Sequence, residues 1–207
     1  MIKNVVFDIG NVLVAFRWRE LMEELHLSKE AQDRFEDYVF GSKWWHEFDH
    51  GTMEEDEVVR HLREDNSEYQ EAFELVWKNR DKLVAPYEHA VTWIQELQEA
   101  GYRVYLLSNY PANLFTMHAE NGSFPFLDMV DGKVVSGYVK MIKPEPDIYE
   151  YLVENYGLKA SECVFLDDRK ENVEGAKAVG MFGIQVHNYE QAKSELQELL
   201  RAQSWDV

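Results

Sequence analysis

The sequence has few cysteines and few long apolar runs. Its one cysteine, Cys163, excludes an intrachain disulfide and a cysteine-rich metal site. No apolar run approaches the length that spans a membrane. The run at 5–7 is interrupted by Asp8 and Gly10 before it could form the core of a signal peptide. We therefore expect a cytoplasmic protein that does not enter a membrane.

Basic residues are also scarce. The chain has 21 Lys and Arg against 39 Asp and Glu, which gives a net charge of −18 at pH 7. This charge repels phosphate backbones and anionic lipid surfaces, so we expect neither a nucleic acid nor a membrane as a partner. The sequence carries no indication of an oligomeric state.

The order of the predicted elements indicates an α/β protein. Strands are expected at 3–7, 103–107, 164–166 and 182–186, with a further strand near 129–130 and a short segment near 134–135. Helices are expected at 86–100, 148–156, 172–179 and 190–200. Short apolar strands that alternate with helices of this length predict a Rossmann-like, mostly parallel sheet.

The stretch 16–83 has a different character. It is charged and amphipathic, its apolar residues recur at helical spacing, and it contains no convincing strand. Thr52 and Glu55 have the spacing of a capping box at the start of one of its helices. Because this stretch follows the first strand, we predict an α/β core domain of 1–15 and 84–207, with a small α-helical bundle of 16–83 inserted into it.

Polar side chains follow three of the predicted strands, at Asp8, Ser108–Asn109 and Asp167–Asp168. Each alone is typical of a turn or a helix cap. Ligands bind at the carboxyl ends of parallel strands, however, and these five residues converge there if the strands are neighbours. Three carboxylates at one point repel one another unless a cation lies among them, and oxygen ligands favour Mg²⁺. Such a cluster beside a hydroxyl, an amide and a lysine predicts a site for a phosphoryl group.

Four segments resemble the ordered motifs of the haloacid dehalogenase (HAD) superfamily. They are VVFDIGNVL at 5–13, LLSN at 106–109, KPEP at 143–146 and VFLDD at 164–168. Each motif is weak alone, but their order and the strands before them make the set specific. The resemblance implies a HAD-like core, and the helical insertion corresponds to a type 1 cap. Within the superfamily, the motifs look like those of sugar-1-phosphate phosphatases and of the phosphatase domain of soluble epoxide hydrolases.

The resemblance implies a phosphatase that works through an aspartyl-phosphate. Asp8 would be the nucleophile, and Lys143 would neutralise the intermediate. Ser108 and the backbone amide of Asn109 would hold the phosphoryl oxygens. The expected activity is Mg²⁺-dependent hydrolysis of small phosphorylated metabolites, sugar phosphates such as a hexose-1-phosphate among them.

The resemblance also implies which groups hold the Mg²⁺ ion. The ligands would be Asp8, the backbone carbonyl of Gly10 and Asp168, with Asp167 as a further or water-mediated partner. Asn172 lies one helical turn beyond Asp168, and we predict that it orients that carboxylate. An ordinary polar position in the first turn of a helix explains Asn172 equally well.

Gly10 departs from the pattern of the superfamily. Most phosphatases of this kind have a second Asp at that position, which acts as general acid and base, and glycine donates no proton. Its absence favours a good leaving group, such as the anomeric oxygen of a sugar-1-phosphate, unless the cap supplies the proton. The segment 44–51 offers His46, Glu47 and Asp49, and its aromatic residues either stack on a sugar or pack the cap.

Two other functions remain compatible with the sequence. A metal-independent 2-haloacid dehalogenase uses the same Asp nucleophile and also lacks the second Asp, although Asp167 and Asp168 argue against it. A degenerate HAD protein would bind a phosphorylated ligand or a protein partner without catalysis. The presence of Asp8, Lys143 and the acidic pair argues against that function.

Overall fold

The computed structural model describes residues 1–204 and has a five-stranded parallel sheet at its centre. The strand order is β5-β4-β1-β6-β7. The strands are β1 (Asn4–Phe7), β4 (Arg103–Ser108), β5 (Gly132–Val135), β6 (Cys163–Asp167) and β7 (Phe182–Gln185). Every pairing in this sheet is parallel. The predicted α/β fold is confirmed.

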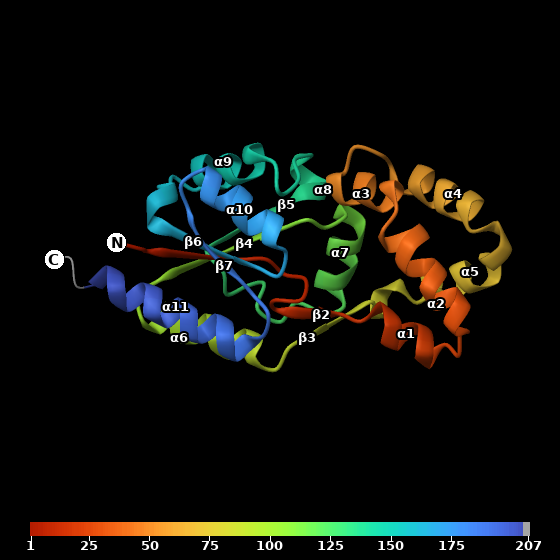
Figure 1. Ribbon diagram of the computed structural model, residues 1–207, viewed down its shortest axis with the longest axis horizontal. Helices are drawn as coiled ribbons and strands as arrows, with labels where there is room; N and C mark the ends of the chain where they lie inside the picture. Colours follow the sequence, from red (N-terminus) through yellow and green to blue (C-terminus); the bar gives the residue numbers. More distant parts are fainter. Residues whose placement is uncertain (205–207) are drawn as a thin grey trace.

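Helices cover both faces of the sheet (Figure 1). One face carries α6 (His89–Glu99) and α11 (Tyr189–Ser204), and the other carries α9 (Pro146–Asn155) and α10 (Lys170–Ala178). Side chains alternate along each strand, so β1 contributes Val5 and Phe7 to one apolar cluster and Val6 to the other. Burial on both faces explains why these strands are continuous apolar runs.

The helical insertion lies at one end of the sheet (Figure 1). Its helices are α1 (Trp18–Glu24), α2 (Lys29–Phe35), η1 (Glu36–Phe40), α3 (Lys43–His50), α4 (Glu55–Asp65), η2 (Ser67–Tyr69), α5 (Gln70–Lys78) and η3 (Arg80–Lys82). Aromatic rings fill its interior: Phe35 packs against Phe40 and Phe73, and Phe40 packs edge-on against Trp45. The predicted insertion of helices into the α/β fold is confirmed.

A two-stranded antiparallel ribbon connects the insertion to the sheet. It consists of β2 (Val14–Phe16) and β3 (Val84–Pro86), with Ala15 opposite Ala85. The expectation that a helix begins at Pro86 is therefore wrong, because Pro86 ends a strand and α6 begins at His89. Three residues per strand are too few to produce a period-2 pattern, so the sequence does not predict this ribbon.

Two further local predictions are wrong. The segment 129–130 forms no strand, and the edge strand β5 begins at Gly132 instead. The capping box at the start of α4 does not form: the N-cap residue is Glu54, without a side-chain cap. The Thr52 hydroxyl instead donates to the Glu47 carboxylate at the end of α3.

The remaining helices lie near the end of the sheet that faces the insertion. They are α7 (Ala112–Glu120) and α8 (Ser136–Val139), while the short turn η4 (Ala160–Glu162) precedes β6. Helix α3 of the insertion packs directly on α8. None of the helices in residues 1–204 combines the length and the apolar character that a membrane crossing requires.

Candidate active site

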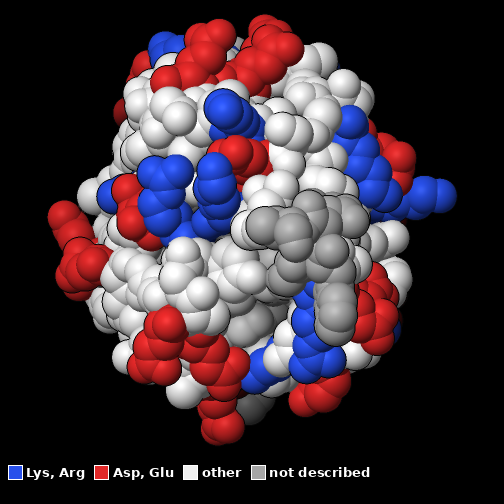
Figure 2. Space-filling view, turned by 90° about the vertical axis from the view of Figure 1, so that its left-hand side faces the viewer, with Lys and Arg blue, Asp and Glu red and all other residues white. Residues whose placement is uncertain are grey.

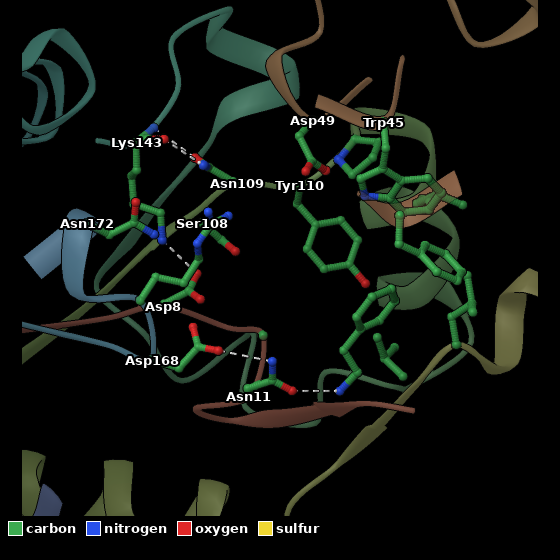
Figure 3. A pocket seen from close by; sticks show the side chains of 18 of the residues that line it. Asp8, Asn11, Trp45, Asp49, Ser108, Asn109, Tyr110, Lys143, Asp168 and Asn172 are labelled. Atoms are coloured by element: carbon green, nitrogen blue, oxygen red, sulfur yellow. Dashed lines mark hydrogen bonds and ion pairs between the residues drawn. The ribbon is translucent and has the colours of Figure 1, made fainter. Parts of the chain in front are cut away.

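The ends of the three central strands bring the predicted polar residues together. Phe7 of β1 lies opposite Leu106 of β4 and Leu166 of β6. The residues that follow therefore reach the same edge of the sheet, where Asp8, Ser108 and Asp168 line one cavity of about 240 Å³ (Figure 3). Asn109 and Gly10 line the same cavity. The structure thus brings these predicted site residues to one place.

Lys143 joins two of the carboxylates. Its buried Nζ donates to Asp8 Oδ1 at 2.9 Å, to Asp167 Oδ2 at 2.6 Å and to the Leu107 carbonyl at 2.9 Å. The Asn109 side chain fixes the Lys143 backbone, because its Oδ1 accepts from Lys143 N and its Nδ2 donates to Lys143 O, both at 2.9 Å. Burial alone would lower the pKa of Lys143, but the two carboxylates outweigh it and raise that pKa.

Asp167 is fully buried and has hydrogen-bond partners on both oxygens. Asn172 Nδ2 lies 3.1 Å from Oδ1 and 3.0 Å from Oδ2, and Arg169 N donates to Oδ1 at 2.8 Å. The prediction that Asn172 orients Asp168 is therefore wrong, because Asn172 contacts the neighbouring carboxylate of Asp167. Asp167 is the last residue of β6 and points toward the start of α10, whereas Asp168 has already left the strand.

Asn11 holds Asp168 in place, which the sequence analysis missed. Asn11 Nδ2 donates to Asp168 Oδ2 at 3.1 Å, and its Oδ1 accepts from Phe16 N at 3.2 Å (Figure 3). The backbone of Asn11 is left-handed, with φ 54°, a conformation that asparagine tolerates better than most residues. In the sequence, the asparagine directly after Gly10 is the one feature that could have indicated this contact.

The electrostatics of the cluster favour a bound cation. One oxygen from each of Asp8, Asp167 and Asp168 lies within 4.8 Å of the others. The pKa of Asp8 is raised to about 6: burial is the main cause, Lys143 opposes it, and the other two carboxylates add to it. Burial also raises the pKa of Asp168. One ammonium group thus faces three carboxylates, and hard oxygen donors of this kind suit Mg²⁺.

The insertion and the ribbon of β2 and β3 supply the far wall of the cavity. Phe40 and Trp45 of the insertion and Phe16 and Val84 of the ribbon are among the lining residues, so this wall is largely apolar. Asp49 on α3 also faces the cavity (Figure 3). Helix α3 is fixed at both ends, by Ser42 Oγ, which accepts from Trp45 N at 3.1 Å, and by Gly51, whose φ of 75° ends the helix.

The other two predicted proton sources do not line this cavity. His46 is exposed, and the carboxylate of Glu47 accepts from the Thr52 hydroxyl. Successive residues of a helix point about 100° apart, so only one side of α3 faces the site.

A buried tyrosine and histidine form a second polar pair that the sequence analysis missed. Tyr110 Oη lies 2.6 Å from His118 Nδ1, and His118 Nε2 lies 2.9 Å from the Arg80 carbonyl. Because a carbonyl only accepts, His118 carries its proton on Nε2, and Tyr110 donates to Nδ1. Burial lowers the pKa of His118, which keeps the ring neutral.

Several characterised proteins are similar to this chain. A sesquiterpene phosphatase from Aspergillus oryzae is 27% identical over 96% of both chains. A D-ribitol-5-phosphate phosphatase from Bacteroides thetaiotaomicron is 27% identical over 98% of this chain and 100% of its own. Mouse bifunctional epoxide hydrolase 2 is 42% identical over 73 residues, which are 35% of this chain and 13% of that protein.

Solved structures share the fold. A predicted HAD-like hydrolase from Porphyromonas gingivalis superimposes with a TM-score of 0.75 at 22% identity, over 97% of this chain and 98% of its own. A HAD family enzyme from Bacteroides thetaiotaomicron, solved with magnesium and inorganic phosphate, gives a TM-score of 0.68 at 23% identity, over 89% and 94%.

The family assignment rests on most of the chain. Residues 2–180 match the haloacid dehalogenase-like hydrolase family, a range that contains the sheet edge with Asp8, Lys143 and Asp168 as well as the inserted helices. The predicted resemblance and the predicted enzyme class are confirmed. This chain belongs to the haloacid dehalogenase-like hydrolase family.

Proposed function

We propose that this chain is a Mg²⁺-dependent phosphatase of small phosphorylated metabolites and that Asp8 forms the aspartyl-phosphate. The observation that carries the proposal is the position of Asp8 in the lining of the cavity, 2.9 Å from the Lys143 ammonium and within a cluster of three carboxylates. A carboxylate nucleophile beside a lysine and a cation site is suited to phosphoryl transfer, in which positioning and charge neutralisation supply most of the rate.

Each of the other residues has a role in this proposal. An Asp8 oxygen attacks phosphorus, and the bond from phosphorus to the leaving oxygen breaks, its electron pair going to that oxygen. Ser108 and the backbone amide of Asn109 bind the phosphoryl oxygens. Lys143 offsets the negative charge of Asp8 and of the transferred group, and Asp167 holds the Lys143 ammonium in place.

Asp8, Asp168 and the carbonyl of Gly10 would hold the Mg²⁺ ion. The donor set fits, because the buried Asp8 and the partly buried Asp168, both with raised pKa values, gain from a divalent cation between them. When bound, the ion supplies charge neutralisation at the phosphoryl oxygens. Asp167 was predicted as a further or water-mediated partner, and the hydrogen bonds on both of its oxygens favour the water-mediated role.

For the substrate we propose a phosphate monoester with a leaving group that fits the apolar wall. A sugar phosphate is the first candidate, since the rings of Phe16, Phe40 and Trp45 offer surfaces on which a sugar ring can stack. A phosphorylated apolar alcohol is a second candidate, because these side chains form few hydrogen bonds with hydroxyl groups. Relatives of similar identity are a polyol phosphate phosphatase and a sesquiterpene phosphatase, so they favour neither.

The test is an assay of phosphate release from both ester classes, with Mg²⁺ and with EDTA. We expect turnover with Mg²⁺, loss of turnover with EDTA, and loss in Asp8→Asn, because an amide neither attacks phosphorus nor replaces the charged ligand. Asp37→Asn is the matched control: Asp37 is exposed in the insertion, so this variant should keep full activity.

Two outcomes would replace this proposal with another. Chloride release from 2-chloropropionate in the presence of EDTA would assign the dehalogenase activity. Tight binding of phosphate esters without turnover, in the presence of Mg²⁺, would assign the degenerate binding function.

A further inference from the structure

Gly10 leaves the leaving oxygen without a proton donor on the sheet side of the site. Two of the titratable groups that line the cavity are already committed. The Lys143 ammonium donates to Asp8 and Asp167, and its raised pKa keeps the proton on nitrogen. The Tyr110 hydroxyl donates to His118, and burial raises its pKa well above the ordinary value.

Asp49 is the carboxyl group that the insertion places opposite Asp8. Figure 3 shows its side chain directed into the cavity from α3, across the open space from Asp8. The side chain is partly buried, and no hydrogen bond or ion pair to its carboxylate oxygens occurs within residues 1–204. A carboxyl group in this position is free to exchange a proton with a ligand.

The backbone of Asp49 is fixed to the sheet domain. The Ser136 hydroxyl donates to the Asp49 carbonyl, and Ser136 Oγ accepts from Tyr110 N at 2.8 Å. One residue farther on, His50 Nε2 lies 3.1 Å from the Lys140 carbonyl. Helix α3 is therefore attached to the sheet domain at the residue that faces the nucleophile.

Two glycines allow this close attachment. A Cβ atom at Gly51 would lie 2.5 Å from the Gly137 carbonyl oxygen, and a Cβ atom at Gly137 would lie 2.4 Å from Ala112 N. Neither position has room for a side chain: the absence of a Cβ at Gly51 lets α3 lie close to α8, and its absence at Gly137 lets α8 lie close to the start of α7. The approach brings Asp49 over the cavity.

We propose that Asp49 is the general acid and base of this enzyme and takes the place of the carboxyl group that Gly10 lacks. The inference rests on the proposed phosphatase function. In the first step an Asp8 oxygen bonds to phosphorus, the ester P–O bond breaks, and the leaving oxygen takes the Asp49 proton, which yields the free alcohol. In the second step Asp49 takes a proton from water, the hydroxide bonds to phosphorus, and the electron pair of the acyl-phosphate P–O bond returns to Asp8.

The charges around Asp49 agree with this cycle. Its pKa is raised to about 7: burial is the main cause, the positive charges of Arg169 and Lys143 oppose it, and the negative charge of Asp8 adds to it. A group with a pKa near neutrality is present in both protonation states at physiological pH, as a residue that first donates and then accepts a proton requires.

Two substrates with different leaving groups distinguish proton donation by Asp49 from any other role of this residue. p-Nitrophenolate leaves without a proton, whereas an alkoxide does not. We expect Asp49→Asn to lower kcat/KM for n-butyl phosphate by about 10²- to 10⁴-fold, and for p-nitrophenyl phosphate by less than about tenfold. Asp49→Glu, which retains a carboxyl group, should recover part of the activity on n-butyl phosphate.

Glu47→Gln is the matched control, because it makes the same change on the same helix but on a side chain that bonds Thr52 and does not line the cavity. Its kcat/KM should equal that of the wild type for both esters. The pH profile gives a second readout: with n-butyl phosphate, kcat of the wild type should fall above about pH 7, and Asp49→Asn should lack this decline.

Different results would overturn the phosphatase function and the role of Asp49. If the wild type releases phosphate with Mg²⁺ and Asp8→Asn does not, the phosphatase function stands. In that case, equal losses on both esters in Asp49→Asn, or no loss on either, would overturn the role of Asp49. If the wild type hydrolyses no phosphate ester, the phosphatase function fails and the role of Asp49 fails with it.

Discussion

Asn11 connects the cation site to the start of the insertion through one side chain. It donates to Asp168 and accepts from the backbone of Phe16, so it sets the direction of a proposed Mg²⁺ ligand without touching the ion. Partners of this kind are worth about 10- to 100-fold in metal affinity. Its left-handed backbone also means that glycine can replace it without strain.

We expect Asn11→Gly to raise the Mg²⁺ concentration needed for half-maximal activity by about 10- to 100-fold, and to change kcat at saturating Mg²⁺ much less. A Mg²⁺ titration of phosphate release measures this. His26→Gly is the control, because His26 is also left-handed, with φ 56°, but is exposed. An unchanged Mg²⁺ requirement in Asn11→Gly would show that Asp168 needs no support from Asn11.

Asp49 has a cost in stability that depends on pH. Its pKa is about 7 in the folded protein, against 3.8 for an unperturbed aspartate. Between these values the folded state binds more protons than the unfolded state, so this group makes stability fall as pH rises through that window. Asn at this position carries no charge at any of these pH values.

Asp49→Asn should therefore have a higher Tm than the wild type at pH 8, and the difference should shrink at pH 5. Each 1 kcal/mol corresponds to about 2–4 °C in a protein of this size. Thermal unfolding of both proteins at the two pH values measures the effect. A constant Tm difference across this range would mean that the carboxyl group titrates normally.

At the scale of single residues, the sequence predicts positions better than partners. Asp8, Ser108 and Asp168 are predictable because each follows a recognisable buried strand. Which carboxylate Asn172 contacts depends on the direction in which Asp167 leaves its strand, and a pattern of apolar residues does not contain that direction. The choice of Asp49 among three candidates on α3 depends on how that helix is rotated against the sheet domain.

The contact between α3 and α8 is the main feature at the scale of elements. Gly51 combines a φ of 75° with a Cβ position 2.5 Å from the Gly137 carbonyl oxygen, so a side chain there has both strain and a backbone clash. Gly101, at the end of α6, has a φ of 89° and nothing within 4 Å of its Cβ position. A substitution at Gly51 therefore tests backbone strain together with the contact between α3 and α8, whereas a substitution at Gly101 tests backbone strain alone.

We expect the strain of the left-handed backbone to lower the free energy of unfolding by about 1–2 kcal/mol in both Gly51→Ala and Gly101→Ala. Only Gly51→Ala should also lower kcat/KM, because the clash moves α3 and Asp49 away from the site. Chemical denaturation and steady-state kinetics on n-butyl phosphate give the two quantities. Full activity in Gly51→Ala would show that the seating of α3 does not matter for turnover.

The sequence predicts long elements and misses short ones. The central strands are apparent because burial on both faces makes them apolar throughout, and α11 because its amphipathic pattern is long. The ribbon of β2 and β3 is missed, since its stability comes from pairing between segments that are 68 to 72 residues apart in the chain. The close packing of α3 on α8 is also missed, because it depends on how two surfaces fit together, and the pattern of neither helix predicts that fit.

At the scale of the whole molecule, the net charge of −18 opposes the approach of a phosphate ester. The charge is not uniform over the surface: the end of the molecule away from the insertion carries Lys and Arg side chains among its acidic ones (Figure 2). The sequence predicts the sign of the overall field from composition. The way in which Lys143 and a cation offset that field locally depends on the assembled site.

Salt should therefore improve substrate binding. At saturating Mg²⁺, we expect the KM for an anionic phosphate ester to fall several-fold as ionic strength rises from low values to about 0.15 M, because screening weakens the repulsion. Sodium and choline salts should act alike if screening is the cause. A KM that rises with salt would show that the field at the cavity entrance is positive.

The ribbon of β2 and β3 limits how the cavity can open. Both covalent connections between the insertion and the sheet domain run through these two paired strands, whereas α3 is held to the sheet domain only by non-covalent contacts with α8 and its neighbours. A rotation of the insertion about the ribbon would open the cavity, and it would have to break the contact between α3 and α8. Because Asp49 lies on α3, such a rotation would withdraw Asp49 as it releases the alcohol, so that product exit and the return of the proton donor would belong to one motion.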